Sequence, residues 1–128
     1  MVFRVLDATA FYAGIPFASN DSFMTTSMVY EEIEHIKTKQ GALEMLQQTN
    51  RLQIRDPTEK SIISVTDASI KTGDNSTISK QDISIVALAL ENNIELITDD
   101  FAVANVAKQL KIKTSSLMTK GISIVGKW

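Results

Sequence analysis

The side chains of this chain that could carry chemistry are acidic, and they stand where short apolar runs stop. The run Ile94–Thr98 ends in two adjacent aspartates, Asp99 and Asp100, and a helical pattern begins at once. Asp7 directly follows another β-rich run, Val2–Leu6. In an α/β protein the carboxyl end of a buried strand is where ligands bind. Acids at such places either start a helix or belong to a metal site.

A glutamate is predicted to face inward on the helix that contains MVYEEIEHIK. At about 100° per residue, Glu32 falls on the same arc as Val29 and Ile33, while Glu31 and Glu34 fall outside it. A carboxylate on an apolar face needs a partner or a cation. Glu32 is therefore a candidate ligand, and a position at the rim of a tilted helix is the alternative.

Asp82 precedes a further helical run, ISIVALALEN. Ser79 and Asp82 have nearly the spacing of a capping box, although that motif prefers Glu or Gln at its last position. Asp82 also shares a helix face with Ile85 and Val86, and this face should point inward. Capping and metal binding are compatible, because a cap can orient the carboxylate. Helix capping is also the alternative role for Asp7. For Asp99 and Asp100 the alternative is that Asp99 is the N-cap of the following helix and Asp100 an acid of its first turn.

The composition favours a hard cation over zinc at these acids. The chain has no cysteine and one histidine, His35, which we interpret as structural or as a surface residue. Mg²⁺ and Mn²⁺ prefer oxygen ligands and keep several waters. Carboxylate clusters that hold such ions commonly serve phosphoryl chemistry, in which the metal activates a water and neutralises charge on the phosphate.

The elements that must bring the acids together alternate between short strands and helices. Strands are predicted at 2–6, 52–54, 94–98 and 112–117, with an edge strand at 122–125. Helices are predicted from about residue 27, over 41–50, from Thr58 to Ile70, after Ser79 and over 101–110. This alternation predicts an α/β fold: a three-layer α/β/α sandwich around a central, mostly parallel sheet of about five strands. The strand ends would then gather the acids at one edge.

Size, hydropathy and charge limit the class of protein. A length of 128 residues predicts a single domain over 1–128. No apolar run approaches the ~20 residues of a membrane span, and the start of the chain lacks the layout of a signal peptide. We therefore expect a cytoplasmic protein with no membrane contact.

The charges are unevenly distributed along the chain. Residues 1–100 hold all fifteen acids, whereas residues 101–128 hold five lysines and no acid. The carboxyl-terminal part is therefore either a polyanion-binding edge or a solvated tail.

Four segments resemble the PIN-domain nucleases and occur in the order that this family uses. They are VLDATAFY, TTSMVYEEI, ISKQDISIVALALE and LITDDFAVANVA. The likeness is closest to the archaeal Nob-type branch, the endonucleases that mature the 3′ end of small-subunit ribosomal RNA. The final KGISIVGKW resembles the segment where the PIN domain of that branch ends.

The resemblance implies a metal-dependent endoribonuclease with one or two Mg²⁺ or Mn²⁺ ions. The implied substrate is precursor rRNA within the small ribosomal subunit, cut by a water to leave 5′-phosphate and 3′-hydroxyl ends. The implied ligands and catalytic residues are Asp7, Glu32, Asp82 and Asp99, with Asp100 as a second-line metal ligand. The resemblance also matches Thr9 and Thr98 to small hydroxyl positions near the metal and Asn105 to a helix-packing position. The candidate RNA-binding residues are Lys108, Lys111, Lys113 and Lys120.

The chain departs from the Nob-type branch at one feature. That branch usually continues into a zinc ribbon with four cysteines, which this chain lacks, so the lysines would carry more of the RNA contact. Two alternatives stay open: a VapC-type toxin ribonuclease, and a non-catalytic PIN module that binds RNA or ribosomal proteins. Pairing of two copies as a homodimer is also left open.

Overall fold

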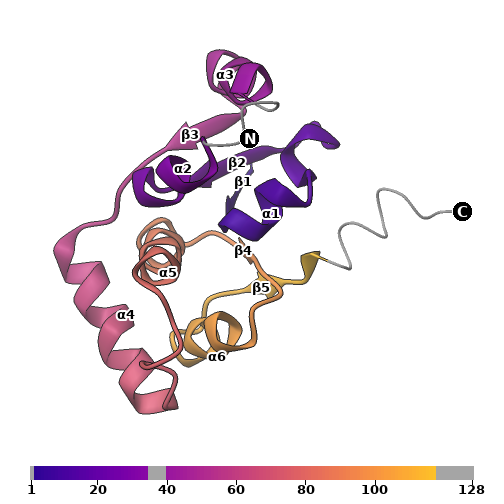
Figure 1. Cartoon of the computed structure of the whole chain (residues 1–128). Helices are drawn as coiled ribbons and strands as arrows, with labels where there is room; N and C mark the ends of the chain where they lie inside the picture. The colour runs from indigo at the N-terminus through magenta and orange to yellow at the C-terminus, as the bar shows by residue number, and fades with distance from the viewer. Residues whose placement is uncertain (1, 35–39, 118–128) are drawn as a thin grey trace, which may run out of the picture.

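The strands form one parallel sheet (Figure 1). The computed structural model describes residues 2–34 and 40–117. In that part the sheet has five strands in the order β3-β2-β1-β4-β5, and every neighbouring pair is parallel. The strands are β1 (Phe3–Leu6), β2 (Ser22–Thr25), β3 (Leu52–Ile54), β4 (Leu96–Ile97) and β5 (Thr114–Ser115). The predicted α/β class with a parallel sheet of about five strands is confirmed.

Helices fill the connections between these strands. They are α1 (Ala8–Tyr12), η1 (Ile15–Phe17), α2 (Ser27–Ile33), α3 (Gln40–Gln48), α4 (Glu59–Thr72), α5 (Lys80–Asn92) and α6 (Phe101–Gln109). Helix α5 packs on β1 and β4, and α4 and α6 pack against α5 and against each other (Figure 1). Helix α3 packs on β3 at the far end of the sheet. Within the described residues no helix has both the length and the hydrophobicity to cross a membrane.

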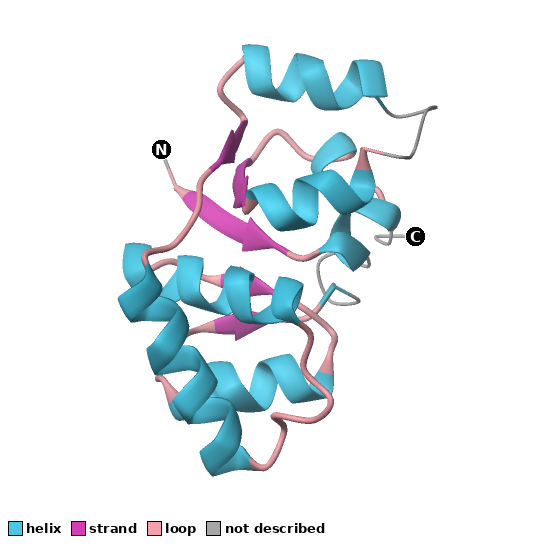
Figure 2. Cartoon of the chain, turned by 60° about the vertical axis from the view of Figure 1, so that its left-hand side comes forward, coloured by secondary structure: helices cyan, strands magenta, loops and turns pink. Residues whose placement is uncertain are grey.

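The strand order reverses at β1, which makes the β1–β4 boundary a topological switch point. From β1 the chain moves to β2 and β3 on one side, and it then crosses back through α4 and α5 to β4 and β5 on the other. In Figure 2 the arrow of β1 and the two strand arrows drawn below it point to the same side. The crevice beyond such strand ends is where open parallel sheets bind ligands.

Short polar side chains start the helices at this edge and elsewhere. Each accepts a hydrogen bond from the backbone N–H three residues further on, which satisfies an otherwise unpaired donor of the first turn. The N-caps with such a bond are Asp7, Thr26, Thr58, Ser79 and Asp100. The predicted caps at Thr58 and Ser79 are confirmed.

Buried apolar residues hold the strands and α5 together. Val5 and Leu6 of β1 and Leu96 and Ile97 of β4 are all buried, as expected of a parallel sheet covered on both faces. In α5 every residue of 85–89 is buried, so this helix lies in the core. Its central position fixes Asp82, in its first turn, relative to the ends of β1 and β4.

The structure differs from the sequence prediction at one strand, β2. Ser22–Thr25 forms β2, which was not predicted because its letters SFMT do not form a long apolar or alternating run. All four of its residues are nevertheless buried, since the strand lies between β1 and β3. The predicted edge strand at 122–125 and the predicted role of His35 concern residues outside the described ranges.

Candidate active site

Asp7 lies at the end of β1 and is almost fully buried, with 5% of its surface exposed. Its Oδ1 accepts a hydrogen bond from the Ala10 N–H at 2.9 Å, so Asp7 caps α1, which was the alternative role left open by the sequence. Its Oδ2 accepts a hydrogen bond from the Thr98 hydroxyl at 3.1 Å. Asp7 is therefore fixed between the ends of β1 and β4.

Burial raises the pKa of Asp7 above the ordinary value of an aspartate. The hydrogen bonds from Ala10 and Thr98 lower this pKa, because they stabilise the ionised form. The negative charges of Asp82 and Asp100 raise it. These two carboxylates from α5 and α6 thus lie within electrostatic reach of Asp7.

Asp82 is held by a reciprocal capping box at the start of α5. The Ser79 N–H donates to Asp82 Oδ2 at 3.3 Å, and the Asp82 N–H donates to Ser79 Oγ at 3.0 Å. The predicted cap is confirmed, although Asp replaces the more usual Glu or Gln. The side chain is half-buried and oriented by its own helix, as a pre-positioned ligand would be.

The two aspartates after β4 have different partners. Asp100 is the N-cap of α6: its Oδ1 accepts from the Val103 N–H at 3.1 Å, and its own N–H donates to Thr98 Oγ1 at 3.0 Å. Asp99 Oδ1 accepts from the Ser116 hydroxyl at 2.5 Å and from the Leu117 N–H at 2.8 Å. The alternative with Asp99 as the N-cap is therefore wrong. The ranking of Asp99 above Asp100 as a metal ligand stays a prediction. Of the two, it is Asp100 whose charge raises the pKa of Asp7.

Glu32 is exposed, and the prediction that it faces inward is wrong. Val29 and Ile33 are buried, but Met28 is 39% exposed. The buried face of α2 is therefore narrower than the sequence pattern suggested, and Glu32 lies at its rim. Its Oε2 accepts a hydrogen bond from the Tyr12 hydroxyl of α1 at 3.4 Å. Glu31 and Glu34 are exposed as expected.

The donor set of this edge fits a hard divalent cation in its chemistry. It consists of the carboxylates of Asp7, Asp82 and Asp100, with the buried Thr98 hydroxyl beside them. The ion pairs of the described residues both involve Arg4, at the other end of β1, so they leave this charge uncompensated. Within 2–34 and 40–117 no three acidic or histidine side chains already converge closely enough to hold one metal ion. An ion held by three of these carboxylates would therefore require their side chains to move.

Three of the candidate RNA-binding lysines lie away from this edge. Lys113 immediately precedes β5 and Lys111 lies between α6 and β5, at the amino ends of the strands. Lys108 is in the last turn of α6, whose first residue follows Asp100. An RNA strand that touched these lysines and the acids would have to extend around the β5 side of the sheet. Lys120 lies outside the described residues.

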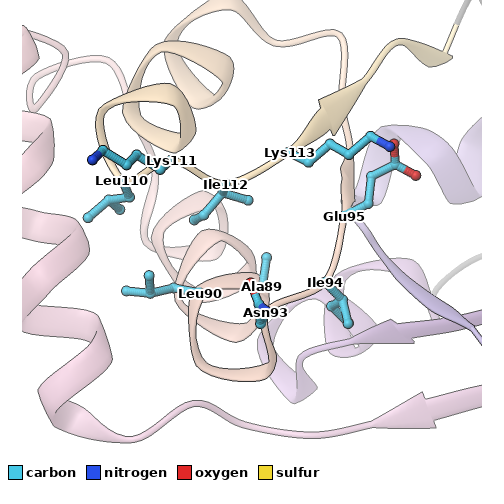
Figure 3. Close-up of a pocket in the computed structure, with 9 residues that line it drawn as sticks. All are labelled: Ala89, Leu90, Asn93, Ile94, Glu95, Leu110, Lys111, Ile112 and Lys113. Atoms are coloured by element: carbon cyan, nitrogen blue, oxygen red, sulfur yellow. The ribbon is translucent and has the colours of Figure 1, made fainter.

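Lys111 and Lys113 line a cavity of about 300 Å³ at this opposite edge (Figure 3). Its remaining lining residues come from the end of α5, the start of the β4 segment and the α6–β5 connection. Figure 3 shows Glu95 extending beside Lys113, so a carboxylate shares this surface with the lysines. RNA binding by these lysines stays a prediction.

Sequence reasoning missed two contacts of the site. The bond from Tyr12 to Glu32 joins residues 20 positions apart, and the bond from Ser116 to Asp99 joins residues 17 positions apart. A local pattern does not encode such pairs. The family resemblance alone predicts Thr98 near a metal, and the structure shows its hydroxyl bonded to the candidate ligand Asp7.

The fold, the strand-end acids and the chain's similarity to known proteins agree on its family. The family described as "PIN domain of ribonuclease" matches residues 4–91, which is well over half of the chain. The chain belongs to the PIN-domain ribonuclease family.

Within that family the chain is similar to Nob1 endonucleases. It is 39% identical over 118 residues to Endoribonuclease Nob1 of Methanocaldococcus jannaschii, covering 91% of this chain and 57% of that relative. It is 32% identical over 124 residues to Endoribonuclease Nob1 of Pyrococcus abyssi, covering 97% of this chain and 73% of that one. It is also 36% identical over 80 residues to the 20S-pre-rRNA D-site endonuclease NOB1 of Saccharomyces cerevisiae, covering 62% of this chain and 17% of the yeast protein. The chain thus spans little more than half of the length of the Methanocaldococcus relative.

A solved structure supports the fold independently. The PilT N-terminus domain protein SSO1118 from Sulfolobus solfataricus P2 aligns with a TM-score of 0.60 at 19% identity. The alignment covers 98% of this chain and 95% of that protein. At this identity the likeness shows the shared fold alone.

Proposed function

We propose that this chain is the catalytic domain of a divalent-metal-dependent endoribonuclease that processes precursor rRNA of the small ribosomal subunit. The observation that carries the proposal is the buried Asp7 at the switch point, with Asp82 and Asp100 close enough to act on its charge. Membership of the PIN-domain ribonuclease family and similarity to Nob1 endonucleases support the reaction and the substrate class. We propose a cytoplasmic location for the same activity.

The residues that would hold Mg²⁺ or Mn²⁺ are Asp7, Asp82 and Asp100, with Glu32 and Asp99 as further ligands after side-chain rotation. One or two bound ions would supply an activated water and charge neutralisation at the phosphate. The chain's own contribution is to hold the carboxylates in place. Thr98 fixes Asp7 and the backbone of Asp100, while Ser79 fixes Asp82.

The reaction that fits this site is hydrolysis of a phosphodiester. The water oxygen forms a bond to phosphorus, the bond from phosphorus to the 3′ oxygen breaks, and that oxygen takes up a proton. The products carry a 5′-phosphate and a 3′-hydroxyl. The activity is endonucleolytic because the phosphodiester that is cut lies within the RNA strand and not at its end.

Cleavage of a precursor rRNA fragment in Mn²⁺, mapped at nucleotide resolution, tests the proposal. We expect a discrete cut near the 3′ end of the mature small-subunit rRNA, and we expect Asp82→Asn to abolish it. Asn can still accept the Ser79 N–H, so the variant should keep its fold by circular dichroism. Asp67→Asn, at an exposed acid of α4, is the matched control and should cleave normally.

Three outcomes would contradict the proposal. Full cleavage activity in Asp82→Asn would show that the carboxylate of Asp82 is not required for the reaction. Absence of cleavage in both Mn²⁺ and Mg²⁺, with RNA still bound, would favour a non-catalytic binding module. Cleavage of tRNA or mRNA together with growth arrest on expression would favour a toxin of the VapC type.

A further inference from the structure

Two aromatic side chains are exposed beside the candidate acids. Tyr12, the last residue of α1, is 53% exposed, and Phe101, the first residue of α6, is 79% exposed. The Tyr12 hydroxyl is 3.4 Å from the Glu32 carboxylate. Phe101 directly follows Asp100, whose charge acts on Asp7. Each ring is thus one residue or one hydrogen bond from an acid of the site.

The core does not account for either ring. Phe11, the neighbour of Tyr12, is 1% exposed and packs in the core, so α1 already has its aromatic anchor. In α6 the buried residues are Val103, Val106 and Ala107, and Phe101 lies outside that set. Burial of a Phe side chain contributes about 1.5–3 kcal/mol to the stability of a fold, and the exposed Phe101 does not make this contribution. Scattered exposed apolar residues are common, so the position of this pair at the acidic edge is what makes it informative.

The electrostatics of this edge are poor for holding RNA. Residues 1–100 hold eight lysines and arginines against fifteen acids. The lysines at 108, 111 and 113 lie toward the opposite edge. Lys80 at the start of α5 and Arg55 after β3 are exposed basic residues at the acidic edge itself. Phosphate contacts by basic side chains normally dominate the affinity of proteins for nucleic acid. Because the aspartates at this edge outnumber these two basic residues, an uncharged contact would help to position the strand, and stacking of bases on aromatic rings is the common one.

We propose that Tyr12 and Phe101 are stacking platforms for unpaired bases of the RNA on either side of the phosphate to be cut. This inference rests on the proposed function, because it assumes that the acids act on RNA. Paired bases in a duplex do not offer their faces to a side chain, whereas unpaired bases can be splayed and stacked. The rings would thus select single-stranded RNA.

The Tyr12 hydroxyl allows stacking to be separated from hydrogen bonding. The Tyr12 hydroxyl donates to Glu32 Oε2 at 3.4 Å. Tyr12→Phe removes this bond and keeps the ring, whereas Tyr12→Leu removes both. Stacking predicts that only the leucine variant loses RNA affinity.

Fluorescence anisotropy of a labelled RNA oligonucleotide that spans the mapped cut tests the inference. Divalent metal is omitted, so that binding is measured without cleavage. We expect Tyr12→Leu and Phe101→Leu each to weaken binding by about tenfold, and Tyr12→Phe and Phe101→Trp to bind like the parent chain. The control Ile70→Ala removes an apolar residue of α4 that is 59% exposed and should have no effect.

A second RNA with abasic sites on both sides of the cut distinguishes stacking from a folding defect. The parent chain should bind this RNA more weakly, and the leucine variants should lose nothing further. Unchanged affinity of both leucine variants for the intact RNA would overturn the inference. An equal loss of affinity on intact and abasic RNA would overturn it as well.

RNA cleavage by the parent chain is measured separately, so that the two proposals can fail independently. Binding that depends on the rings, without cleavage, would contradict the proposed function alone. Cleavage with binding that does not depend on the rings would contradict this inference alone.

Discussion

The Thr98 hydroxyl donates a hydrogen bond to Asp7 Oδ2 at 3.1 Å and so joins the end of β4 to the end of β1. The same oxygen accepts a hydrogen bond from the Asp100 N–H at 3.0 Å. Both bonds lie at the topological switch point of the sheet. Thr98 therefore fixes the side chain of Asp7, a candidate ligand, and the backbone of Asp100, a second candidate ligand that also caps α6.

Thr98→Val should destabilise the fold and disturb the site. The substitution keeps the shape of the buried side chain but leaves Asp7 Oδ2 and the Asp100 N–H without this partner. The expected loss is about 1–3 kcal/mol in the free energy of unfolding, measured in urea. Thr98→Ser keeps the hydroxyl and should lose clearly less. Equal losses in the two variants would mean that the methyl contacts, and not the hydrogen bonds, matter here.

Asp7→Asn should stabilise the chain at neutral pH while it abolishes cleavage. Burial and the charges of Asp82 and Asp100 raise the pKa of Asp7 in the folded state. The stabilisation that protonated Asp7 gives is complete below the unfolded pKa of about 3.9 and is lost as pH rises through the folded pKa. Asn imitates the protonated form at every pH and can still accept the Ala10 N–H. Urea unfolding between pH 3 and pH 8 should show a gain over the parent chain near neutrality that vanishes in acid, and a constant difference would refute the linkage.

Asp99 and Asp100 should separate in their effects on metal and on local structure. Asp100→Asn should abolish Mn²⁺-dependent cleavage and weaken Mn²⁺ binding in calorimetry, because Asp100 acts on Asp7. Asp99→Asn should affect cleavage less. Asp99→Ala, which removes the oxygen that accepts the Leu117 N–H, should speed hydrogen exchange of that amide. If Asp99→Asn lost Mn²⁺ binding and Asp100→Asn did not, Asp99 would be the primary ligand.

Glu91→Gln should destabilise the chain at neutral pH and not in acid. Glu91, near the end of α5, accepts hydrogen bonds from the Thr58 N–H, the Thr58 hydroxyl and the Ser61 hydroxyl at the start of α4. The Thr58 hydroxyl is the main cause of the lowered pKa of Glu91, and the Thr58 N–H follows. This stabilisation is present above the unfolded pKa of about 4.3 and is lost as pH falls through the folded pKa.

The expected loss in Glu91→Gln at pH 7 is about 0.5–1 kcal/mol, since the group is exposed and solvent weakens its bonds. Urea unfolding at pH 7 and at pH 3 measures it. Asp67→Asn, at an exposed acid in the middle of α4, serves as the control. A loss that persists unchanged at pH 3 would show that the charge of Glu91 is not responsible.

Local sequence determined much of this protein. The apolar strand ends, the caps at Thr58 and Ser79 and the α/β alternation depend on residues that are near one another in the chain, and all were predictable. The positions of Asp7 and Asp82 at helix starts were predictable for the same reason, because a cap bonds to a backbone group three residues away. Family resemblance then linked these positions to a nuclease.

Only the tertiary structure decided which acids act on one another. Strand β2 is held between two neighbours, so its burial is not visible in its own four letters. The exposure of Glu32 depends on how α2 packs against α1 and α5, which helical periodicity cannot give. Asp99 and Asp100 are adjacent in sequence, yet one bonds to the segment after β5 and the other caps α6. Adjacent residues at a strand end point in different directions, so which of them faces Asp7 depends on how separate strands and helices are packed.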